Sequence, residues 1–329
     1  MEPLIVILGP TATGKTGISL EIAKKVGGEI ISGDSMQVYR GMDIGTAKIK
    51  HEEAKGIPHY LIDIKNPDDS FSVAEFQKLA RERIQYITNK RKIPMLVGGT
   101  GLYIHSVIDP YKFMEKDLTQ ESNKPYRQEL LKLAEEHGKE YLHKILSDVD
   151  AKAAERIHPN DLKRVTRALE YFHSTGKQIS KNRDATLDNT SIINRNESGS
   201  LYNTVLIGLT MERSLLYQRI EQRVDKMMED GLLDEVKNLL GQGYSPKLCS
   251  MQGVGYKQLI GHLEGEYTLE EAVTLIKRDT RHFAKRQLTW FKRDLRINWF
   301  EVDKYNSCDE NLLLDILTII GRNIDSNVE

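Results

Sequence analysis

The sequence predicts an α/β fold, with a mostly parallel sheet flanked by helices and a helical insertion that interrupts it. Two observations predict this fold. Short apolar runs alternate with helical patterns along much of the chain, as at residues 4–8 and 16–26. Between residues 112 and 200, helical periodicity dominates and no apolar run of comparable strength occurs. We therefore expect a core in residues 1–111, an insertion in 112–200 that closes with a polar loop at 181–200, and a continued core in 201–329 that carries a basic helix and a C-terminal segment.

Composition limits the class of protein. A hydrophobic content of 39%, a charged content of 29% and a formal net charge of -1 are typical of a soluble globular chain and indicate no partner. Cys249 and Cys308 have no metal-like spacing, which argues against a disulfide or zinc framework and favours a reducing compartment. No early apolar run is long enough for a signal peptide or a membrane span. We expect a cytoplasmic protein that does not associate with membranes and acts as a monomer.

The first predicted strand, "LIVIL" at residues 4–8, leads into "GPTATGKT" at residues 9–16 and then into a helical pattern. This stretch fits the phosphate-binding loop pattern G-x-x-x-x-G-K-[ST] in its required context of strand, loop and helix, and it predicts a P-loop-type core. Backbone N–H groups of residues 11–14 are expected to cradle an oxyanion, Lys15 to add a positive charge, and the Thr16 hydroxyl to bind Mg²⁺. The predicted phosphate-binding residues are Gly9, Pro10, Thr11, Ala12, Thr13, Gly14, Lys15 and Thr16.

Further strands are expected at "GEIIS", ending near Ser32, around residues 95–97, at 203–211 and at 297–302. Polar residues follow these strand ends, and the carboxyl ends of parallel strands form the ligand-binding edge of such sheets. An NTPase would also need an acidic residue after a hydrophobic strand to position magnesium. Asp34 and Asp63 are candidates, but neither follows a clean apolar run. The loop therefore predicts a polyphosphate ligand without establishing hydrolysis.

Several longer blocks occur in a specific order: "GPTATGKT", "SGDSMQVYRGMDIGTAK", "HYLIDI", "VGGTGLY", "NDLKRVTRALE", "QGVGYKQL" and "AKRQLTWFKRD". In this order they closely resemble the bacterial tRNA dimethylallyltransferases, over nearly the whole chain and most weakly at residues 181–200 and after residue 306. The resemblance implies that the loop holds the diphosphate of dimethylallyl diphosphate. It also implies that the acceptor is N6 of adenosine 37, in the anticodon loop of tRNAs that read codons beginning with U. Whether ATP also binds the loop is left open.

Transfer of an allyl group to an aromatic amine requires a stabilised diphosphate leaving group and removal of a proton from the amine. Lys15, the backbone donors and Mg²⁺ on Thr16 meet the first need. Asp34 is the best candidate for the base, with helix capping or indirect support of magnesium as alternative roles. Arg219 and Arg223 share a helix face. The family pattern favours Arg223 as the residue that reaches the diphosphate, and the alternative is a solvated face with Glu221, Asp225 and Glu229 nearby.

Recognition of tRNA should involve extrusion of the target base into a pocket. The residues beside Asp34 are placed for this contact: Ser35, Met36 and Gln37, whose amide can bond to a base edge. By resemblance Thr100 also touches the tRNA, and its alternative role is the N-cap of a helix over residues 102–108. The resemblance implies that a further segment binds tRNA, formed by Lys163, Arg164, Val165, Thr166 and Arg167.

A late basic segment, residues 276–296, holds eight Lys/Arg against two Asp. Such a surplus is expected of a surface that binds a phosphate backbone. Within it Ala284, Leu288, Phe291 and Leu295 follow helical spacing and predict a core stripe, with the role of Trp290 undecided. The charged face of the same helix is left for RNA.

Three other functions fit parts of the pattern. A small-molecule kinase would use a similar loop, with the insertion as a lid. An adenylate isopentenyltransferase would perform the same chemistry on a free nucleotide, but would not require the insertion or the basic helix. A non-catalytic RNA-binding GTPase would carry an N-K-x-D block, which is not recognisable in this sequence. The tRNA enzyme is therefore the favoured hypothesis.

Overall fold

The computed structural model describes the chain except for residues 112, 114–123, 182–199, 306–309 and 325–329. Its internal contacts define two units: one comprises Met1–Pro110 and Asn196–Glu329, and the other comprises Tyr111–Arg195. These limits lie close to the insertion limits expected from the sequence, 112 and 200, without coinciding with them. The predicted polar loop falls almost entirely outside the described residues. Each unit has its own buried apolar core.

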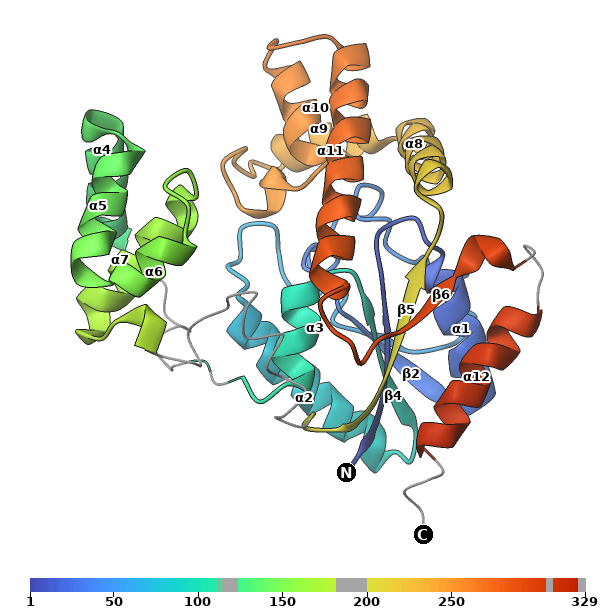
Figure 1. The fold of residues 1–329 in the computed structure, drawn as a ribbon. Helices are drawn as coiled ribbons and strands as arrows, with labels where there is room; N and C mark the ends of the chain where they lie inside the picture. Colours follow the sequence, from blue (N-terminus) through green and yellow to red (C-terminus); the bar gives the residue numbers. More distant parts are fainter. Residues whose placement is uncertain (112, 114–123, 182–199, 306–309, 325–329) are drawn as a thin grey trace. The chain divides into compact units, whose positions relative to one another are not determined.

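A six-stranded sheet forms the centre of the larger unit (Figure 1). Its strands are β1 (Pro3–Leu8), β2 (Gly28–Ser32), β3 (His59–Tyr60), β4 (Ile93–Gly98), β5 (Asn203–Thr210) and β6 (Asn298–Glu301). They pair in the order β3-β2-β4-β1-β5-β6, and each of these pairs is parallel. The predicted α/β fold is thereby confirmed. Among the described strands, only β3 was not predicted, because two residues are too few to give an apolar run.

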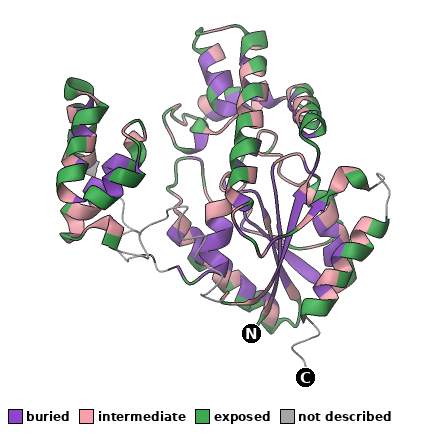
Figure 2. Cartoon of the chain, viewed as in Figure 1, coloured by how far each residue is buried: buried purple, intermediate pink, exposed green. Residues whose placement is uncertain are grey.

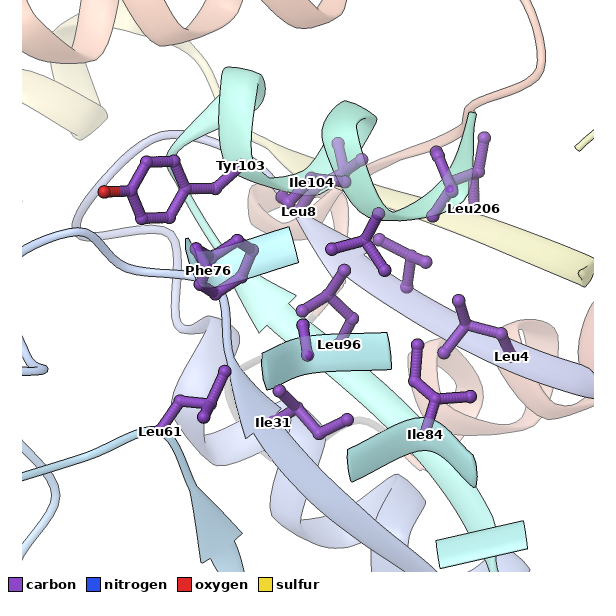
Figure 3. Packing of buried hydrophobic residues seen from close by; sticks show 14 of the residues in the cluster. Leu4, Leu8, Ile31, Leu61, Phe76, Ile84, Leu96, Tyr103, Ile104 and Leu206 are labelled. Carbon is purple, nitrogen blue, oxygen red and sulfur yellow. The ribbon is translucent and has the colours of Figure 1, made fainter. Parts of the chain in front are cut away.

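Helices cover both faces of the sheet. α1 (Lys15–Val26) and α12 (Glu310–Ile324) lie on one face, and α2 (Val73–Asn89) and α3 (Gly101–Ile108) lie on the other (Figure 1). Along β1, alternate side chains enter the two cores, and Figure 2 shows the central strands largely buried. Figure 3 shows the α2–α3 side, where the rings of Phe76 and Tyr103 stack with centroids 4.4 Å apart. Burial on both faces explains the continuous apolar run at residues 4–8.

Four further helices lie beyond the carboxyl ends of the strands: α8 (Arg213–Glu229), α9 (Leu232–Gly241), α10 (Tyr256–Leu263) and α11 (Leu269–Phe291) (Figure 1). They share a separate apolar cluster that includes Val236, Leu259 and Ile276. This cluster holds α8 and α11 above the edge of the sheet where the strand ends meet.

One part of the predicted α11 stripe is wrong. Ala284 and Phe291 are buried and Leu288 is partly buried, as expected, but Leu295 is 79% exposed. The helix ends at Phe291, so helical spacing no longer applies four residues later. Trp290, left undecided by the sequence, packs partly buried against the core cluster on the α2–α3 face.

The smaller unit is helical in its described residues. Its helices are α4 (Lys124–His137), α5 (Lys139–Val149), α6 (Ala151–Arg156) and α7 (Leu162–Thr175), followed by a short 3₁₀ turn, Ile179–Lys181. Leu142, Leu146 and Val165 are fully buried in its core. The Asp161 side chain caps α7 by accepting a hydrogen bond from the Arg164 N–H at 3.3 Å. In neither unit does a described helix have the length and apolar character needed to cross a membrane.

Candidate active site

A cavity of about 570 Å³ lies in the larger unit at the carboxyl edge of the sheet. The neighbouring strands β1 and β4 continue into α1 and α3, which lie on opposite faces, so a crevice opens between the loops that follow these strands. Lys15, Asp34 and Thr100 follow three different strands and all line this cavity. Arg223 lines it from α8. The parallel sheet therefore brings together site residues that are distant in the sequence.

The phosphate-binding loop leaves backbone donors unpaired. Gly9 has φ 140°, and a Cβ atom there would lie 2.3 Å from the Leu209 carbonyl oxygen, so this close passage requires glycine. Ala12 and Gly14 adopt left-handed φ values of 67° and 85°, and α1 begins directly after Gly14. In the described part of the chain, the N–H groups of Ala12, Thr13 and Gly14 have no hydrogen-bond partner. Unpaired N–H groups at the start of a helix form an anion-binding site.

The loop differs in detail from the sequence expectation. The Thr11 N–H was expected to face the phosphate, but it donates to Gln287 Oε1 at 2.9 Å. Thr13 is 1% exposed, and its hydroxyl donates to the Pro10 carbonyl oxygen at 2.9 Å. Five of the eight predicted residues line the cavity: Thr11, Ala12, Gly14, Lys15 and Thr16. Gly9, Pro10 and Thr13 instead shape the loop behind them.

Lys15 is placed to receive an anion. Its Nζ atom donates to the Pro10 carbonyl oxygen at 2.7 Å. The pKa of Lys15 is lowered to about 7, mostly by burial and in addition by the Arg223 guanidinium, while the Asp34 carboxylate opposes the change. Two cationic side chains thus lie within electrostatic range of each other, a costly arrangement that a bound polyanion would relieve.

Arg223 and Arg219 have different environments although they are one helical turn apart. Arg223 lines the cavity, and among the described residues it has no hydrogen-bond or ion-pair partner. Burial lowers the pKa of Arg223, and the Asp34 carboxylate opposes this. Arg219 is exposed and does not line the cavity. The predicted alternative partners are engaged elsewhere, since Glu221 pairs with Arg281 and Asp225 pairs with Lys277.

Asp34 follows β2 and has one carboxylate oxygen available. Its Oδ1 accepts a hydrogen bond from the Met36 N–H at 2.8 Å. This contact closes a turn and does not cap a helix, because residues 35–37 are not helical. In the described chain its Oδ2 has no hydrogen-bond partner. The carboxylate interacts electrostatically with both Lys15 and Arg223, so it lies close to the anion site.

The predicted base-contacting residues Ser35, Met36 and Gln37 and the predicted tRNA contact Thr100 all line the same cavity. Thr100 occupies the N-cap position of α3, but its hydroxyl makes no capping bond and instead donates to Ser35 Oγ at 3.5 Å. The Gln37 amide is engaged within the protein: its Oε1 accepts from Ser32 Oγ at 2.9 Å, and its Nε2 donates to the Thr46 carbonyl at 3.3 Å. Any contact of this amide with a base must therefore coexist with these bonds.

Two residues that support the cavity were missed by sequence reasoning. Glu235 accepts hydrogen bonds from the N–H groups of Asp43, Ile44 and Gly45 at 2.9, 2.7 and 3.1 Å. The Tyr256 hydroxyl also donates to Glu235, at 2.5 Å. This carboxylate holds the loop that contacts Gln37, and no sequence pattern signals it.

Gln287 is the second missed residue. It is 7% exposed, bonds to the phosphate-binding loop, and donates from Nε2 to the Gly99 carbonyl oxygen at 2.9 Å. A sequence signal existed, because Gln287 lies on the same helical stripe as Ala284 and Phe291, and a polar residue on a core face needs buried partners.

The predicted tRNA-binding segment of the smaller unit divides by helical face. Lys163, Arg164 and Arg167 are exposed on α7. Val165 is fully buried and Thr166 is 4% exposed, so their side chains pack into the core of the unit. The tRNA-binding role of the segment stays a prediction, and side-chain contact with RNA is open to Lys163, Arg164 and Arg167. The alternation follows from the helical period, which turns consecutive residues to different faces.

The basic surplus of α11 is smaller than the sequence suggests. Lys277 and Arg281 pair with acidic residues of α8, and Arg278 pairs with Asp279. Beyond the helix, Arg296 bonds to Asp109 and Asp294 at 2.8 and 2.7 Å, and both of these carboxylates are buried. The remaining basic residues of the segment have no ion-pair partner among the described residues: Lys285, Arg286, Lys292 and Arg293. The surface left for RNA is therefore about half of the predicted one.

The model of the IPP transferase family matches residues 37–294. The chain belongs to the IPP transferase family. The tRNA dimethylallyltransferase of Carboxydothermus hydrogenoformans is 52% identical over 323 residues, which cover 98% of each chain. The tRNA dimethylallyltransferase of Bacillus cytotoxicus is 51% identical over 302 residues, which cover 92% of this chain and 90% of the relative.

Solved structures of tRNA-modifying transferases are also similar to this chain. The full-length tRNA isopentenylpyrophosphate transferase of Bacillus halodurans matches with a TM-score of 0.70 and 44% identity, over 100% of both chains. A eukaryotic dimethylallyltransferase acting on tRNA matches with a TM-score of 0.77 and 27% identity, over 99% of this chain and 80% of the other. The resemblance inferred from the ordered sequence blocks is confirmed, and so is the P-loop-type core of this IPP transferase family member.

Proposed function

We propose that this chain is a tRNA dimethylallyltransferase. It transfers the dimethylallyl group from dimethylallyl diphosphate to N6 of adenosine 37 in tRNAs that read codons beginning with U, and it releases diphosphate. One observation carries the proposal: a single cavity contains both an anion site, around Lys15 and Arg223, and the carboxylate of Asp34, one oxygen of which has no hydrogen-bond partner among the described residues. The names of relatives about half identical over nearly the whole chain support the same reaction and do not favour a free-nucleotide acceptor.

The anion site accounts for activation of the leaving group. As the bond between the allylic carbon and the diphosphate oxygen breaks, negative charge grows on the diphosphate. Lys15, Arg223 and the N–H groups of residues 12–14, which have no partner in the described part of the chain, lie where they can stabilise that charge. Preorganised donors of this kind often supply the largest catalytic contribution. The carbon acquires cationic character and becomes reactive toward a weak amine nucleophile.

The cavity also fits a magnesium ion. In the described residues, no group of three or more His, Cys, Asp or Glu could form a metal site made by the protein alone. Mg²⁺ commonly binds through one or two protein oxygens together with substrate phosphates and waters. The exposed Thr16 hydroxyl beside the anion site fits that donor set, and Thr16 would hold the ion with the diphosphate. When bound, Mg²⁺ would add charge neutralisation to the leaving group.

Asp34 acts as the general base. The N6 lone pair is delocalised into the adenine ring, so attack on the allylic carbon must be accompanied by loss of an N6 proton. In this step the N6–C bond forms, the C–O bond to diphosphate breaks, and the proton passes to Asp34 Oδ2. Because Oδ1 is held by the Met36 N–H, the free oxygen has a fixed position at the cavity wall. General base assistance is worth about 10² to 10⁴ in rate.

Access to N6 requires adenosine 37 to leave the base stack, because a stacked base cannot reach a buried carbon. Ser35, Met36 and Thr100 provide two hydroxyls and one apolar side chain at the acceptor wall. The exposed basic residues of α7 would bind tRNA phosphates. We propose that the chain acts as a monomer.

The test is incubation with dimethylallyl diphosphate labelled in the allyl group, offered with an anticodon stem-loop transcript or with AMP. We expect label in the transcript, none in AMP, and none in a matched transcript with guanosine at position 37. Label in AMP would support the free-nucleotide reaction instead. Transfer of phosphate from labelled ATP to a small molecule, without allyl transfer, would support a kinase.

A further inference from the structure

We infer that Gln287 is a positioning residue, which fixes the loop that holds the diphosphate against the loop that meets the acceptor base. Its effect on catalysis rests on the proposed function. Gln287 lines the cavity, but the proposed reaction assigns it no chemical step. Its role is to set the distance between two parts of the site.

The geometry of the amide supports this role. Gln287 Oε1 accepts from the Thr11 N–H at 2.9 Å, and its Nε2 donates to the Gly99 carbonyl at 2.9 Å. One planar group therefore bonds to a donor on one loop and an acceptor on the other. Only a primary amide offers both functions in this arrangement. At 7% exposure the side chain is shielded from water, so leaving either partner unpaired is costly.

The Gln287 amide connects the two loops just beyond the carboxyl ends of β1 and β4. The β1–β4 ladder extends to the pair Leu8 and Gly98, and the pairing of the two strands ends there. Gln287 joins them again immediately past that point. A Cβ atom at Gly99 would lie 2.3 Å from the Gln287 Nε2 atom, so the amide fits only against glycine at this position.

Each anchor point adjoins a substrate-facing residue. Thr11 directly precedes Ala12, whose N–H group belongs to the anion site. Gly99 directly precedes Thr100, which lines the acceptor side of the cavity. Alkyl transfer depends on the distance between a carbon fixed by the first loop and a nitrogen fixed by the second. A misplacement of about 1 Å can cost about 10²-fold in rate. Gln287 also lines the cavity, and it is placed to affect turnover by setting the distance between the two loops.

A purely structural role would have the same buried hydrogen bonds, so a matched control is needed. Gln77 of α2 is 9% exposed, and its Nε2 donates to the Ser106 carbonyl oxygen at 2.7 Å. It does not line the cavity. Gln77→Met therefore removes a comparable buried amide at a position that does not connect the two loops.

The experiment compares the wild type with Gln287→Met, Gln287→Glu and Gln77→Met in the full-length chain. Glutamate keeps an acceptor for the Thr11 N–H but places an oxygen against the Gly99 carbonyl, so it breaks one half of the bridge. Three quantities are measured: the melting temperature, amide hydrogen exchange in residues 9–16 and 98–102, and kcat and KM for both substrates.

We expect Gln287→Met to speed exchange of the Thr11 amide and to lower kcat about 10- to 100-fold, with each KM changed less than about threefold. Gln287→Glu should speed exchange mainly in residues 98–102 and also lower kcat. Gln77→Met should lower the melting temperature but leave kcat and exchange in these segments unchanged.

Unchanged exchange in both Gln287 variants would overturn the inference, whether or not the proposed reaction occurs. An equal loss of kcat in Gln77→Met, or a rise in KM alone, would also overturn it. Failure of the wild type to label tRNA would instead refute the proposed function, and the exchange measurement would still decide whether Gln287 joins the loops.

Discussion

The two ends of the cavity are built differently. At the diphosphate end, two cationic side chains and a set of backbone N–H groups surround a space with no described counter-ion except Asp34. At the acceptor end, the described lining near Asp34 offers hydroxyls and a single carboxylate. The first end is suited to binding a polyanion, and the second is suited to moving one proton. Affinity for the diphosphate and the rate of turnover should therefore respond to different residues.

The largest expected effect comes from the acceptor end. Asp34→Asn keeps an oxygen for the Met36 N–H, which donates to Oδ1 in the native turn at 2.8 Å, but it removes the base. We expect kcat to fall about 10² to 10⁴-fold. Affinity for diphosphate should be equal or slightly stronger, because a negative charge beside the anion site is lost. Single-turnover kinetics together with diphosphate binding would measure both.

A variant with normal turnover would exclude Asp34 as the base. Weakened diphosphate binding would show that Asp34 belongs to the anion site, for example through magnesium. In that case the contrast between the two ends would be wrong.

The next effect comes from the diphosphate end. Removing a charged donor should cost about 1.5–3 kcal/mol, or about 10- to 150-fold in kcat/KM for dimethylallyl diphosphate, in Lys15→Met and in Arg223→Gln. The KM for tRNA should change little. Arg219→Gln is the matched control, because Arg219 lies one turn away on α8 and is exposed.

Arg223→Gln carries a second expectation. Burial lowers the pKa of Arg223, so the folded protein disfavours this charge, and the melting temperature should not fall when it is removed. A site that loses function while stability is kept or gained is typical of binding machinery. A large loss of stability would indicate that Arg223 has a structural role instead.

Much of the fold and part of the site could be predicted from the sequence. The run at residues 4–8 predicted β1 because a strand buried on both faces is continuously apolar. The positions of Lys15 and Asp34 just past strand ends predicted that they share one edge of the sheet, as they do. Local patterns were sufficient wherever a residue's role depends on its own strand or helix.

Contacts between distant segments could not be predicted in the same way. Glu235 binds three consecutive N–H groups nearly two hundred residues away, and nothing near Glu235 in the sequence indicates this. Gln287 takes the Thr11 N–H, which the loop pattern alone assigned to phosphate. The prediction that Leu295 is buried was wrong because helical spacing does not reveal that the helix ends at Phe291. The unpredicted features therefore depend on which elements meet in space.

A smaller effect should appear in the pH dependence of the diphosphate end. Burial lowers the pKa of Lys15 from 10.5 to about 7. Above about pH 7 the free protein increasingly carries a neutral Lys15, and diphosphate binding must then take up a proton. Affinity for inorganic diphosphate should fall with rising pH, by at most about tenfold per pH unit.

Calorimetry in buffers of different ionisation enthalpy would measure the proton uptake, and Lys15→Arg should flatten the profile because arginine stays charged. The effect of Lys15 on stability has the opposite pH dependence to its effect on diphosphate affinity. Between about pH 7 and 10.5 the unfolded chain holds the Lys15 proton more tightly, so this group makes the free energy of unfolding rise with pH. A flat binding profile in the wild type would show that Lys15 remains charged in the free protein.

The smallest effect should come from α7, whose charges belong to neither end of the cavity. Lys163 and Arg167 are exposed on this helix, and Arg164 is exposed but pairs with Asp161 at 3.3 Å. If these side chains contact tRNA phosphates, Lys163→Gln should lower the slope of log affinity against log salt by roughly 0.7–0.9, with kcat unchanged.

Arg164→Gln should lower this slope less, because the Arg164 charge is already partly compensated. Lys144→Gln, on α5 of the same unit, removes an exposed charge outside the α7 segment and should leave the slope unchanged. An equal change in Lys144→Gln would mean that tRNA responds to the charge of the unit as a whole and that the α7 segment has no special role.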